Sequence, residues 1–240
     1  RAAIRAEDHQ TYAQLLHFGF EAAAEAEAAY DRALEMQPDA IESLLGRAAL
    51  RGQRGDLEGA RADLSAAEVA GVSVFHLQLA EAELQRAAGE PEAAIETLLS
   101  AIEREPSNPR GRLVLFETLV AEAEAGQLAF DQVRAEATDQ FWRVGREVRD
   151  TARFQTAAAK FWELKAVLLE DPDPAQAALR RLRALTHLER AESSSTGPEL
   201  GLPPESDGRV DGLSAAELPT WRARLLIGLQ RFLEAESQLS

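Results

Sequence analysis

Cysteine is absent from the 240 residues, which excludes disulfide bonds, thiol catalysis and Cys-based zinc sites. The sequence also lacks any run of about 18 uncharged apolar residues, so we expect no membrane span. Lysine occurs only as Lys160 and Lys165. What the chain does have in excess is alanine, at 46 residues, and acidic side chains, at 41 against 26 basic ones. With 45% hydrophobic and 28% charged residues, the composition fits a soluble globular chain and argues against wholesale disorder.

Motifs of catalysis and cofactor binding are also missing. The sequence has no GxxxxGK[ST], GxGxxG or GxSxG segment, and none of its four histidines stands three to five residues from another. Its carboxylates stand at spacings typical of a helix surface, as in Glu21, Glu25 and Glu27. We therefore expect no enzyme activity, no cofactor and no metal site.

The net charge of −15 is unevenly distributed. Residues 1–106 carry a net charge of −11, residues 107–192 carry −1, and residues 193–240 carry −3. Because phosphate backbones are repelled by such acidity, nucleic acid is not expected as a partner of the first half. That half either binds a basic protein segment or presents a solvated acidic face.

An internal repeat of 34 residues runs through the first half of the chain. Three lines of small or large apolar residues recur at this offset, and they are Ala26, Ala60 and Ala94, then Tyr30, Leu64 and Leu98, then Ala33, Ala67 and Ala101. Within each repeat the three positions are four and three residues apart, which places them on one helical stripe. The alanines would let two helices approach closely, while the larger residue would fill the space between them.

Glycine and proline punctuate the repeat. Gly55 and Gly89, one period apart, are expected to end helices in the left-handed conformation, and Pro91 to begin the next helix. Pro38 and Pro106, two periods apart, are expected to stop the second helix of a pair. The expected caps of the helices that follow are Asp39 with Glu42, and Asn108 before Pro109.

The residues of this repeat resemble the tetratricopeptide repeat (TPR) family, whose unit is a helix–turn–helix of 34 residues. The resemblance covers about residues 20–125 and rests on Leu44, Leu45, Gly46, Ala48, Gly55, Leu57, Ala60, Leu64 and Ala67, and again on Ala94, Leu98, Ala101 and Pro106. It implies an all-α fold, an alpha-alpha superhelix that forms a right-handed solenoid of antiparallel helix pairs.

The chain is expected to divide into four segments. Residues 1–125 form the regular, acidic TPR array, and residues 126–192 are either degenerate repeats or a helical packing domain. Gly126 is expected to separate a pair of helices over Arg110–Ala125 and Leu128–Val148. Further along the second segment we expect a helix marked by Phe154, Ala158, Phe161, Leu164 and Leu168, a break capped by Asp173 before Pro174, and one helix face carrying Leu179, Leu182, Leu185 and Leu188. Residues 193–212 are predicted to be a flexible loop. Residues 213–240 look like the start of a further repeat, which we expect to be cut short at Ser240.

The family resemblance also implies where a partner would bind. In TPR proteins the first helix of each pair lines a concave groove that commonly holds a peptide. The residues at those positions are Glu42, Leu45, Ala49 and Gln53, then His76, Leu79, Glu83 and Arg86, then Arg110, Leu113, Glu117 and Val120. Most lack the Lys, Asn and Arg with which chaperone-binding members clamp a carboxylate, so a partly apolar groove for a helix or an extended peptide is expected instead. The alternative is that Leu45, Leu79 and Leu113 pack neighbouring helices.

A second candidate surface is a basic stripe formed by Trp142, Arg146, Arg149 and Arg153. Their spacing of four, three and four would align an indole and three guanidinium groups on one helix face, able to hold an acidic peptide. Alternatively, the arginines pair with nearby acids and Trp142 belongs to the core. The same two interpretations apply to Arg180, Arg181 and Arg183.

The sequence thus favours a non-catalytic scaffold or adaptor that binds a peptide or helix of another protein. One alternative is the recognition arm of a larger enzyme or regulator whose working domain lies outside this sequence, and another is self-association through terminal helices. The first residues do not have the pattern of a secretory signal, so we expect either that the protein has none or that it lies outside this sequence. This favours the cytoplasm, leaves the periplasm open and does not determine the compartment.

Overall fold

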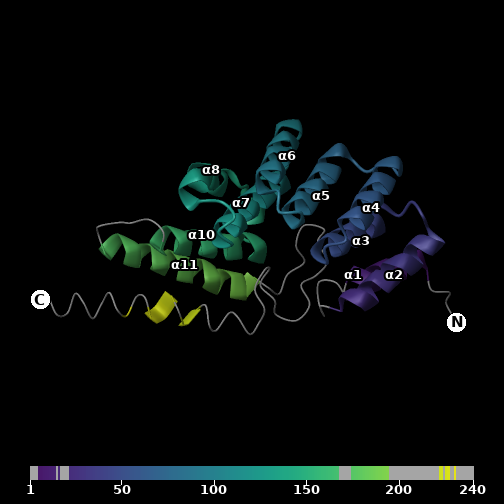
Figure 1. The fold of residues 1–240 in the computed structure, drawn as a ribbon. Helices are drawn as coiled ribbons and strands as arrows, with labels where there is room; N and C mark the ends of the chain where they lie inside the picture. The colour runs from purple at the N-terminus through teal and green to yellow at the C-terminus, as the bar shows by residue number, and fades with distance from the viewer. Residues whose placement is uncertain are drawn as a thin grey trace, which may run out of the picture. The chain divides into compact units, whose positions relative to one another are not determined.

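The computed structural model of the protein describes residues 5–14, 16, 22–167, 174–194, 222–223, 225–227 and 230. The helices that it defines are α1 (Ala6–Gln14), α2 (Ala23–Met36), α3 (Ile41–Gln53), α4 (Leu57–Val69), α5 (Val74–Ala87), α6 (Pro91–Arg104), α7 (Pro109–Glu124), α8 (Phe130–Arg143), α9 (Arg146–Arg149), α10 (Ala152–Val167) and α11 (Pro174–Ser194) (Figure 1). No strand occurs in these residues. Asp173, residues 195–212 of the predicted loop and most of the predicted repeat 213–240 lie outside them.

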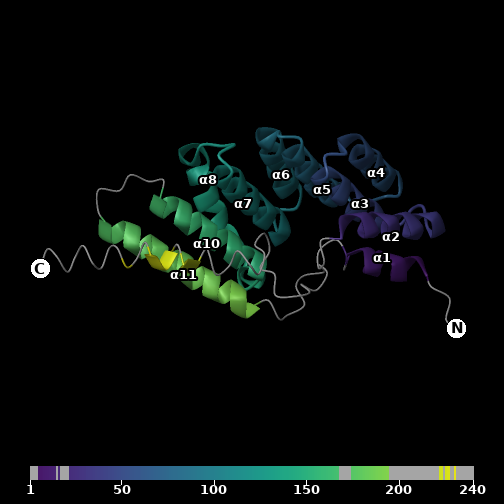
Figure 2. The same ribbon diagram turned by 60° about the horizontal axis from the view of Figure 1, so that its bottom comes forward.

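The chain forms two compact units, an N-terminal unit up to Val114 and a C-terminal unit from Leu115, so the boundary falls within α7. In the N-terminal unit α1 packs on α2, α3 on α4 and α5 on α6. Each pair also packs on the next, through α2 with α3 and α4 with α5, and α3 contacts α5 directly (Figure 2). The predicted all-α superhelix of antiparallel helix pairs is therefore confirmed, and the repeat is TPR-like.

The repeated positions form the interior of this array. All six alanines of the two alanine lines are completely buried, at 0% exposure, and Tyr30, Leu64 and Leu98 are exposed by at most 5%. Small residues at helix crossings allow close approach, so the 34-residue spacing creates the same interface in each pair. Each Å² of apolar surface removed from water contributes about 25 cal/mol to stability. The burial of these repeated side chains therefore stabilises the contacts between the stacked helices.

Helix ends follow the predicted glycines and prolines. Gly55 and Gly89 have φ angles of +82° and +77°, and Pro91 begins α6 as predicted. In each case the residue after the glycine donates its N–H to a carbonyl five residues earlier, the Schellman pattern, from Asp56 to Arg51 and from Glu90 to Gln85.

The predicted caps are only partly confirmed. The side-chain oxygen of Asn108 accepts a hydrogen bond from the N–H of Arg110, as expected of a cap. The prediction of an Asp39–Glu42 cap is wrong, because α3 begins after Ala40 and has no side-chain cap. Two caps that we did not predict are Asp56 for α4 and Ser73 for α5.

Gly46 shows how neighbouring repeats balance side-chain volume. A Cβ atom at Gly46 would lie 2.5 Å from the hydroxyl of Tyr30, so the fully buried tyrosine fits only against glycine. One period later the corresponding residues are Ala80 and Leu64, which belong to the same apolar cluster. The smaller leucine leaves room for the larger alanine. Burial raises the pKa of Tyr30 well above its ordinary value.

The C-terminal unit has a core of aromatic side chains in place of alanine lines. Phe116 of α7 lies 5.8, 5.7 and 5.5 Å from Phe141, Phe154 and Phe161, measured between ring centroids. Phe161 also contacts Phe130, at 6.2 Å. Edge-to-face and offset arrangements such as these add to the energy of burying the rings. One aromatic cluster therefore joins α7, α8 and α10.

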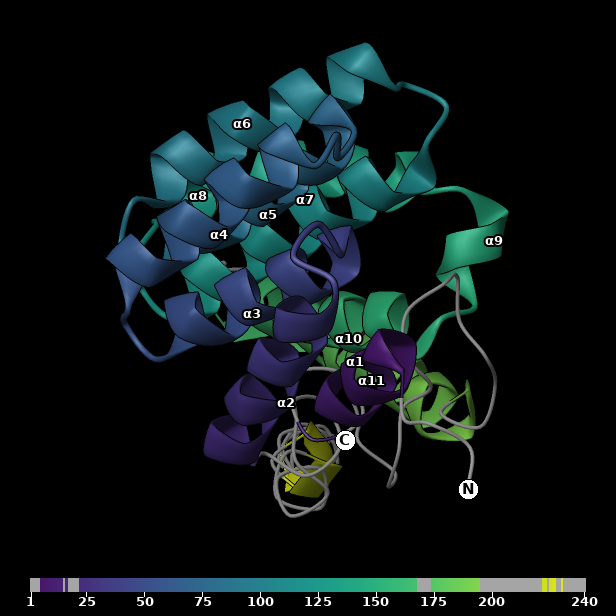
Figure 3. The same cartoon turned by 90° about the vertical axis from the view of Figure 1, so that its right-hand side faces the viewer.

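Two helix predictions for the C-terminal unit are wrong. The helix expected over 128–148 ends at Arg143, and the short helix α9 follows as a separate element (Figure 3). The four leucines of α11 do not share one face, since Leu179 and Leu182 are 41% and 50% exposed whereas Leu185 and Leu188 are buried. Three residues complete about 300° of helical rotation and so fall about 60° short of a full turn. Over the nine residues from Leu179 to Leu188 this shortfall reaches about 180°, which places the two leucines on opposite sides of the helix.

Helices α10 and α11 form an antiparallel hairpin. Nδ1 of His187 lies 2.7 Å from the side-chain oxygen of Gln155, Arg183 stacks on Trp162, and Arg180 donates to the carbonyl of Lys165. Residue numbers therefore increase along α10 while those of the contacting residues in α11 decrease, as expected of antiparallel helices. Burial, followed by the charge of Arg190, lowers the pKa of His187 to about 4.

Candidate interaction surface

The predicted groove residues of α3 and α5 lie on two helices that contact each other. Glu42 and Gln53 on α3 are exposed, as are His76 and Glu83 on α5, and Arg86 is half-buried. Because Glu42 and His76 are one period apart, as are Ala49 and Glu83, the two helices present matching positions side by side. The surface is polar and acidic at its exposed positions.

The apolar groove candidates are more buried than the polar ones. Leu79 is 7% exposed and Leu113 is 4% exposed, which is the degree of burial expected of packing residues, and Val120 is also buried. Leu45 and Ala49 are half-buried, and Leu45 packs against two neighbouring apolar clusters. The apolar contribution to an outer surface here therefore comes from Leu45 and Ala49.

His76 is held at the first turn of α5. Its Nδ1 atom lies 2.7 Å from Oγ of Ser73, and its backbone N–H donates to the same oxygen at 3.3 Å. The ring also meets Phe75 edge to face, at 5.5 Å between centroids. The imidazole therefore has a defined orientation while it remains exposed to solvent.

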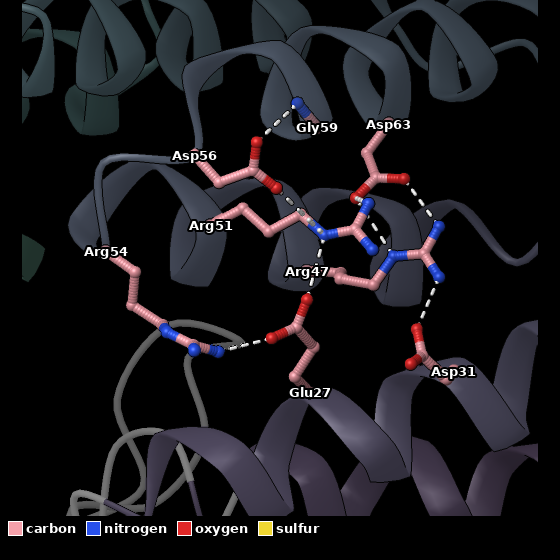
Figure 4. A network of polar contacts seen from close by, with 8 residues as sticks. All are labelled: Glu27, Asp31, Arg47, Arg51, Arg54, Asp56, Gly59 and Asp63. Atoms are coloured by element: carbon pink, nitrogen blue, oxygen red, sulfur yellow. Dashed lines mark hydrogen bonds and ion pairs between the residues drawn. The ribbon is translucent and has the colours of Figure 1, made fainter.

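A network of arginines and carboxylates lies behind this surface and ties α2, α3 and α4 together (Figure 4). Arg47 donates two hydrogen bonds to Asp63, at 2.9 and 2.5 Å, and a third to Asp31 at 2.6 Å. Arg51 donates to Asp63 at 2.9 Å and to Glu27 at 3.1 Å. The carboxylate of Asp63 thus receives both guanidinium groups.

The network extends to the start of α4. Arg54 pairs with Glu27, and Asp56, which caps α4 through the N–H of Gly59, lies 3.9 Å from Arg51 (Figure 4). Burial alone would lower the pKa of Arg47, but its hydrogen bonds and attraction to Asp63 and Asp31 raise that pKa above its ordinary value. Asp63 is only 3% exposed, and breaking a buried pair of this kind costs about 3 to 5 kcal/mol.

The next repeat makes the same contact with uncharged groups. The residues one period after Arg51 and Asp63 are Gln85 and Thr97, and the hydroxyl of Thr97 donates to the Gln85 side chain at 2.9 Å. A polar bridge between the two helices of a pair therefore recurs, while its charge does not. Sequence reasoning did not identify the charged bridge, although Arg47, Arg51 and Arg54 stand four and three residues apart on α3, the spacing of one face.

The α7 groove candidates are differently placed. Arg110 is half-buried beside the cap at Asn108. Glu117 accepts two hydrogen bonds from Arg153, at 2.8 and 2.6 Å, in the bidentate geometry that makes such pairs strong. Glu117 is therefore engaged with α10 within the C-terminal unit.

The predicted basic stripe does not lie along one helix. Trp142 is in α8, Arg146 and Arg149 are in α9, and Arg153 is in α10. The guanidinium of Arg149 donates to the carbonyls of Val144, Phe141 and Trp142, which end α8. Trp142 is 63% exposed, so its predicted core position is wrong. Arg149 and Arg153 stabilise the fold, and Trp142 is an outward-facing indole.

Neither a metal site nor a membrane span is found in the part of the chain that the structure describes. No group of three or more His, Asp and Glu side chains there is arranged to hold a metal ion. None of the helices defined above is both long enough and apolar enough to cross a bilayer.

The chain has a likeness to a solved TPR protein. No family model and no curated protein matches the chain. The chain is similar to the solved structure of YrrB, described as a TPR protein with an unusual peptide-binding site, with 21% identity, a TM-score of 0.41, and coverage of 78% of this chain and 85% of that one. The TPR-like character of the N-terminal unit is shown by its own helix pairs and their spacing.

Proposed function

We propose that the protein is a non-catalytic interaction scaffold of the TPR family, and that its partner is a peptide or helix of another protein. The observation that carries the proposal is the direct contact between α3 and α5, which joins matching positions of consecutive repeats into one surface. Such a surface extends over several repeats without requiring a closed pocket.

The partner segment would combine basic and small apolar side chains. Glu42 offers an exposed carboxylate, His76 an oriented imidazole, and Leu45 and Ala49 a shallow apolar strip between the charged positions. The net charge of −11 over residues 1–106 would also speed the encounter with a basic segment. The charged network behind α3 supports the proposal, because a preformed surface lowers the entropy cost of binding.

The test compares equal changes on the first and second helix of one pair. The variant Glu42→Arg/Ala49→Arg alters the proposed surface of α3, and the matched control Glu58→Arg/Ala62→Arg alters exposed positions of α4. Partner recovery from a source lysate would be quantified by mass spectrometry, with circular dichroism to verify helicity. We expect the α3 variant to lose about tenfold in recovery and the control to change by less than about twofold. Equal recovery by both variants would reject the proposal.

A further inference from the structure

The α10–α11 hairpin carries a cluster of cations that lie over two buried aromatic rings. The Nζ atom of Lys165 lies 4.8 Å from the ring centroid of Phe161 and 4.9 Å from that of Trp162. The guanidinium carbon of Arg183 lies 4.7 Å from the centroid of Trp162. Two cations from two helices thus contact one indole, an arrangement that cation–π attraction stabilises.

Several positive charges lie around Lys165 in this cluster. The pKa of Lys165 is lowered from its ordinary value, first by burial and then by the positive charges of Arg180, Arg134 and Arg183. Among the described residues, no carboxylate forms an ion pair with Lys165, Arg183 or Arg134. Helices α10 and α11 together contain seven basic and three acidic residues, in a protein whose net charge is −15. The cluster is therefore a local excess of positive charge.

Exposed aliphatic side chains lie beside these cations. Leu179 and Leu182 of α11 are 41% and 50% exposed, and Leu179 shares a helix face with Arg183, four residues later. Trp162 is 8% exposed, and its indole N–H meets no acceptor in the described part of the chain. The hairpin therefore combines an indole N–H that has no acceptor among the described residues with two solvent-exposed leucines.

We propose that the surface formed by Arg134, Lys165, Leu179, Leu182 and Arg183, with the buried Trp162 beneath its cations, docks an acidic amphipathic helix of a partner protein. Carboxylates of the partner would pair with the three cations, and its apolar face would cover the two leucines. The exposed leucines favour a protein over a polyphosphate, and the net charge of −15 disfavours long polyanions. The inference is independent of the α3–α5 surface, because all six residues belong to the C-terminal unit.

The experiment uses the full chain and a fluorescein-labelled synthetic peptide of about 15 residues, with Glu and Leu at helical spacing. Fluorescence anisotropy would measure its affinity for the wild type, for Lys165→Gln/Arg183→Gln, and for the matched control Arg32→Gln/Arg61→Gln, which removes two exposed cations from α2 and α4. We expect the first variant to weaken binding by about tenfold, the control by less than about twofold, and added salt to weaken binding to the wild type.

A second variant, Leu182→Glu, changes an exposed residue and should weaken binding to a similar extent by repelling the peptide. Circular dichroism would verify that each variant is folded. Equal affinities of Lys165→Gln/Arg183→Gln and Arg32→Gln/Arg61→Gln would overturn the proposal. A peptide with Gln in place of Glu that binds the wild type as tightly as the original peptide would also overturn it. Stronger binding to duplex DNA or to phosphatidylserine vesicles would overturn it too. Peptide binding that appears only in the variant Glu170→Gln/Asp171→Asn/Asp173→Asn would also overturn the proposal. In that case acidic residues of the same chain, and not a partner, would be the occupants of the cluster.

Discussion

The two units build helix pairs on different kinds of interior. In the N-terminal unit, alanines recur at the helix crossings and a charged network ties three helices together. In the C-terminal unit, phenylalanines from three helices meet in one cluster without a repeat. A periodic interface can be copied from pair to pair because each copy needs only small residues at fixed positions. An aromatic cluster is specific to its neighbours, since each ring fills a space shaped by the others.

The largest effect should come from removing an aromatic ring. Phe161→Ala is expected to lower the free energy of unfolding by about 3 to 5 kcal/mol, because Phe161 is 1% exposed and contacts Phe116, Phe130 and Phe141. Urea denaturation followed by tryptophan fluorescence would measure this, since all three tryptophans lie after Leu115. Phe161→Leu is the milder control. A loss below about 1 kcal/mol for the alanine variant would show that the cluster is not the core of this unit.

The charged network of the N-terminal unit should be nearly as sensitive. Asp63→Asn is expected to cost about 3 kcal/mol, because it leaves the half-buried Arg47 and Arg51 without their shared carboxylate. Asp31→Asn serves as the control, and it should cost less than about 1 kcal/mol since the Asp31 side chain is 46% exposed. Denaturation followed by circular dichroism would compare the two. Similar losses would mean that burial does not set the strength of these pairs.

Acid should weaken the C-terminal unit through His187. Its folded pKa of about 4 lies below the ordinary value of 6.5, so between these pH values the unfolded chain binds a proton that the folded chain does not. The stabilisation is complete above about pH 6.5 and decreases by about 2 kcal/mol as the pH falls to 4. Measured against His187→Gln, the stability advantage of the wild type should shrink over this range. A constant difference would place the imidazole in a solvent-like environment.

The smallest effect tests the exchange of volume between repeats. Gly46→Ala is expected to cost about 1 kcal/mol net, because the clash with Tyr30 exceeds the gain of about 1 kcal/mol in helix propensity. In the background of Tyr30→Leu, which reproduces the Ala80–Leu64 pair of the next repeat, the cost should disappear. A double-mutant cycle on the free energy of unfolding would measure this coupling. Additive effects would contradict the proposed compensation.

Much of the regular half could be predicted because its information is local. The three residue lines, Gly55, Gly89 and Pro91 all have the structural roles expected of them. The candidate surface was harder to predict, since Leu79 and Leu113 are buried while Glu42 and His76 are exposed on the same stripes. A helical period shows which residues share a face, but not how deeply a neighbouring helix covers each of them.

The amino-acid sequence alone therefore determined the all-α class, the 34-residue helix pair and the residues of its interior, because helix periodicity and glycine conformation are properties of short segments. Only the tertiary structure decided which charges meet. Asp63 accepts from an arginine 16 residues away, and Glu117 from one 36 residues away. Pairs at such separations depend on how helices pack, and on which polar groups that packing removes from water.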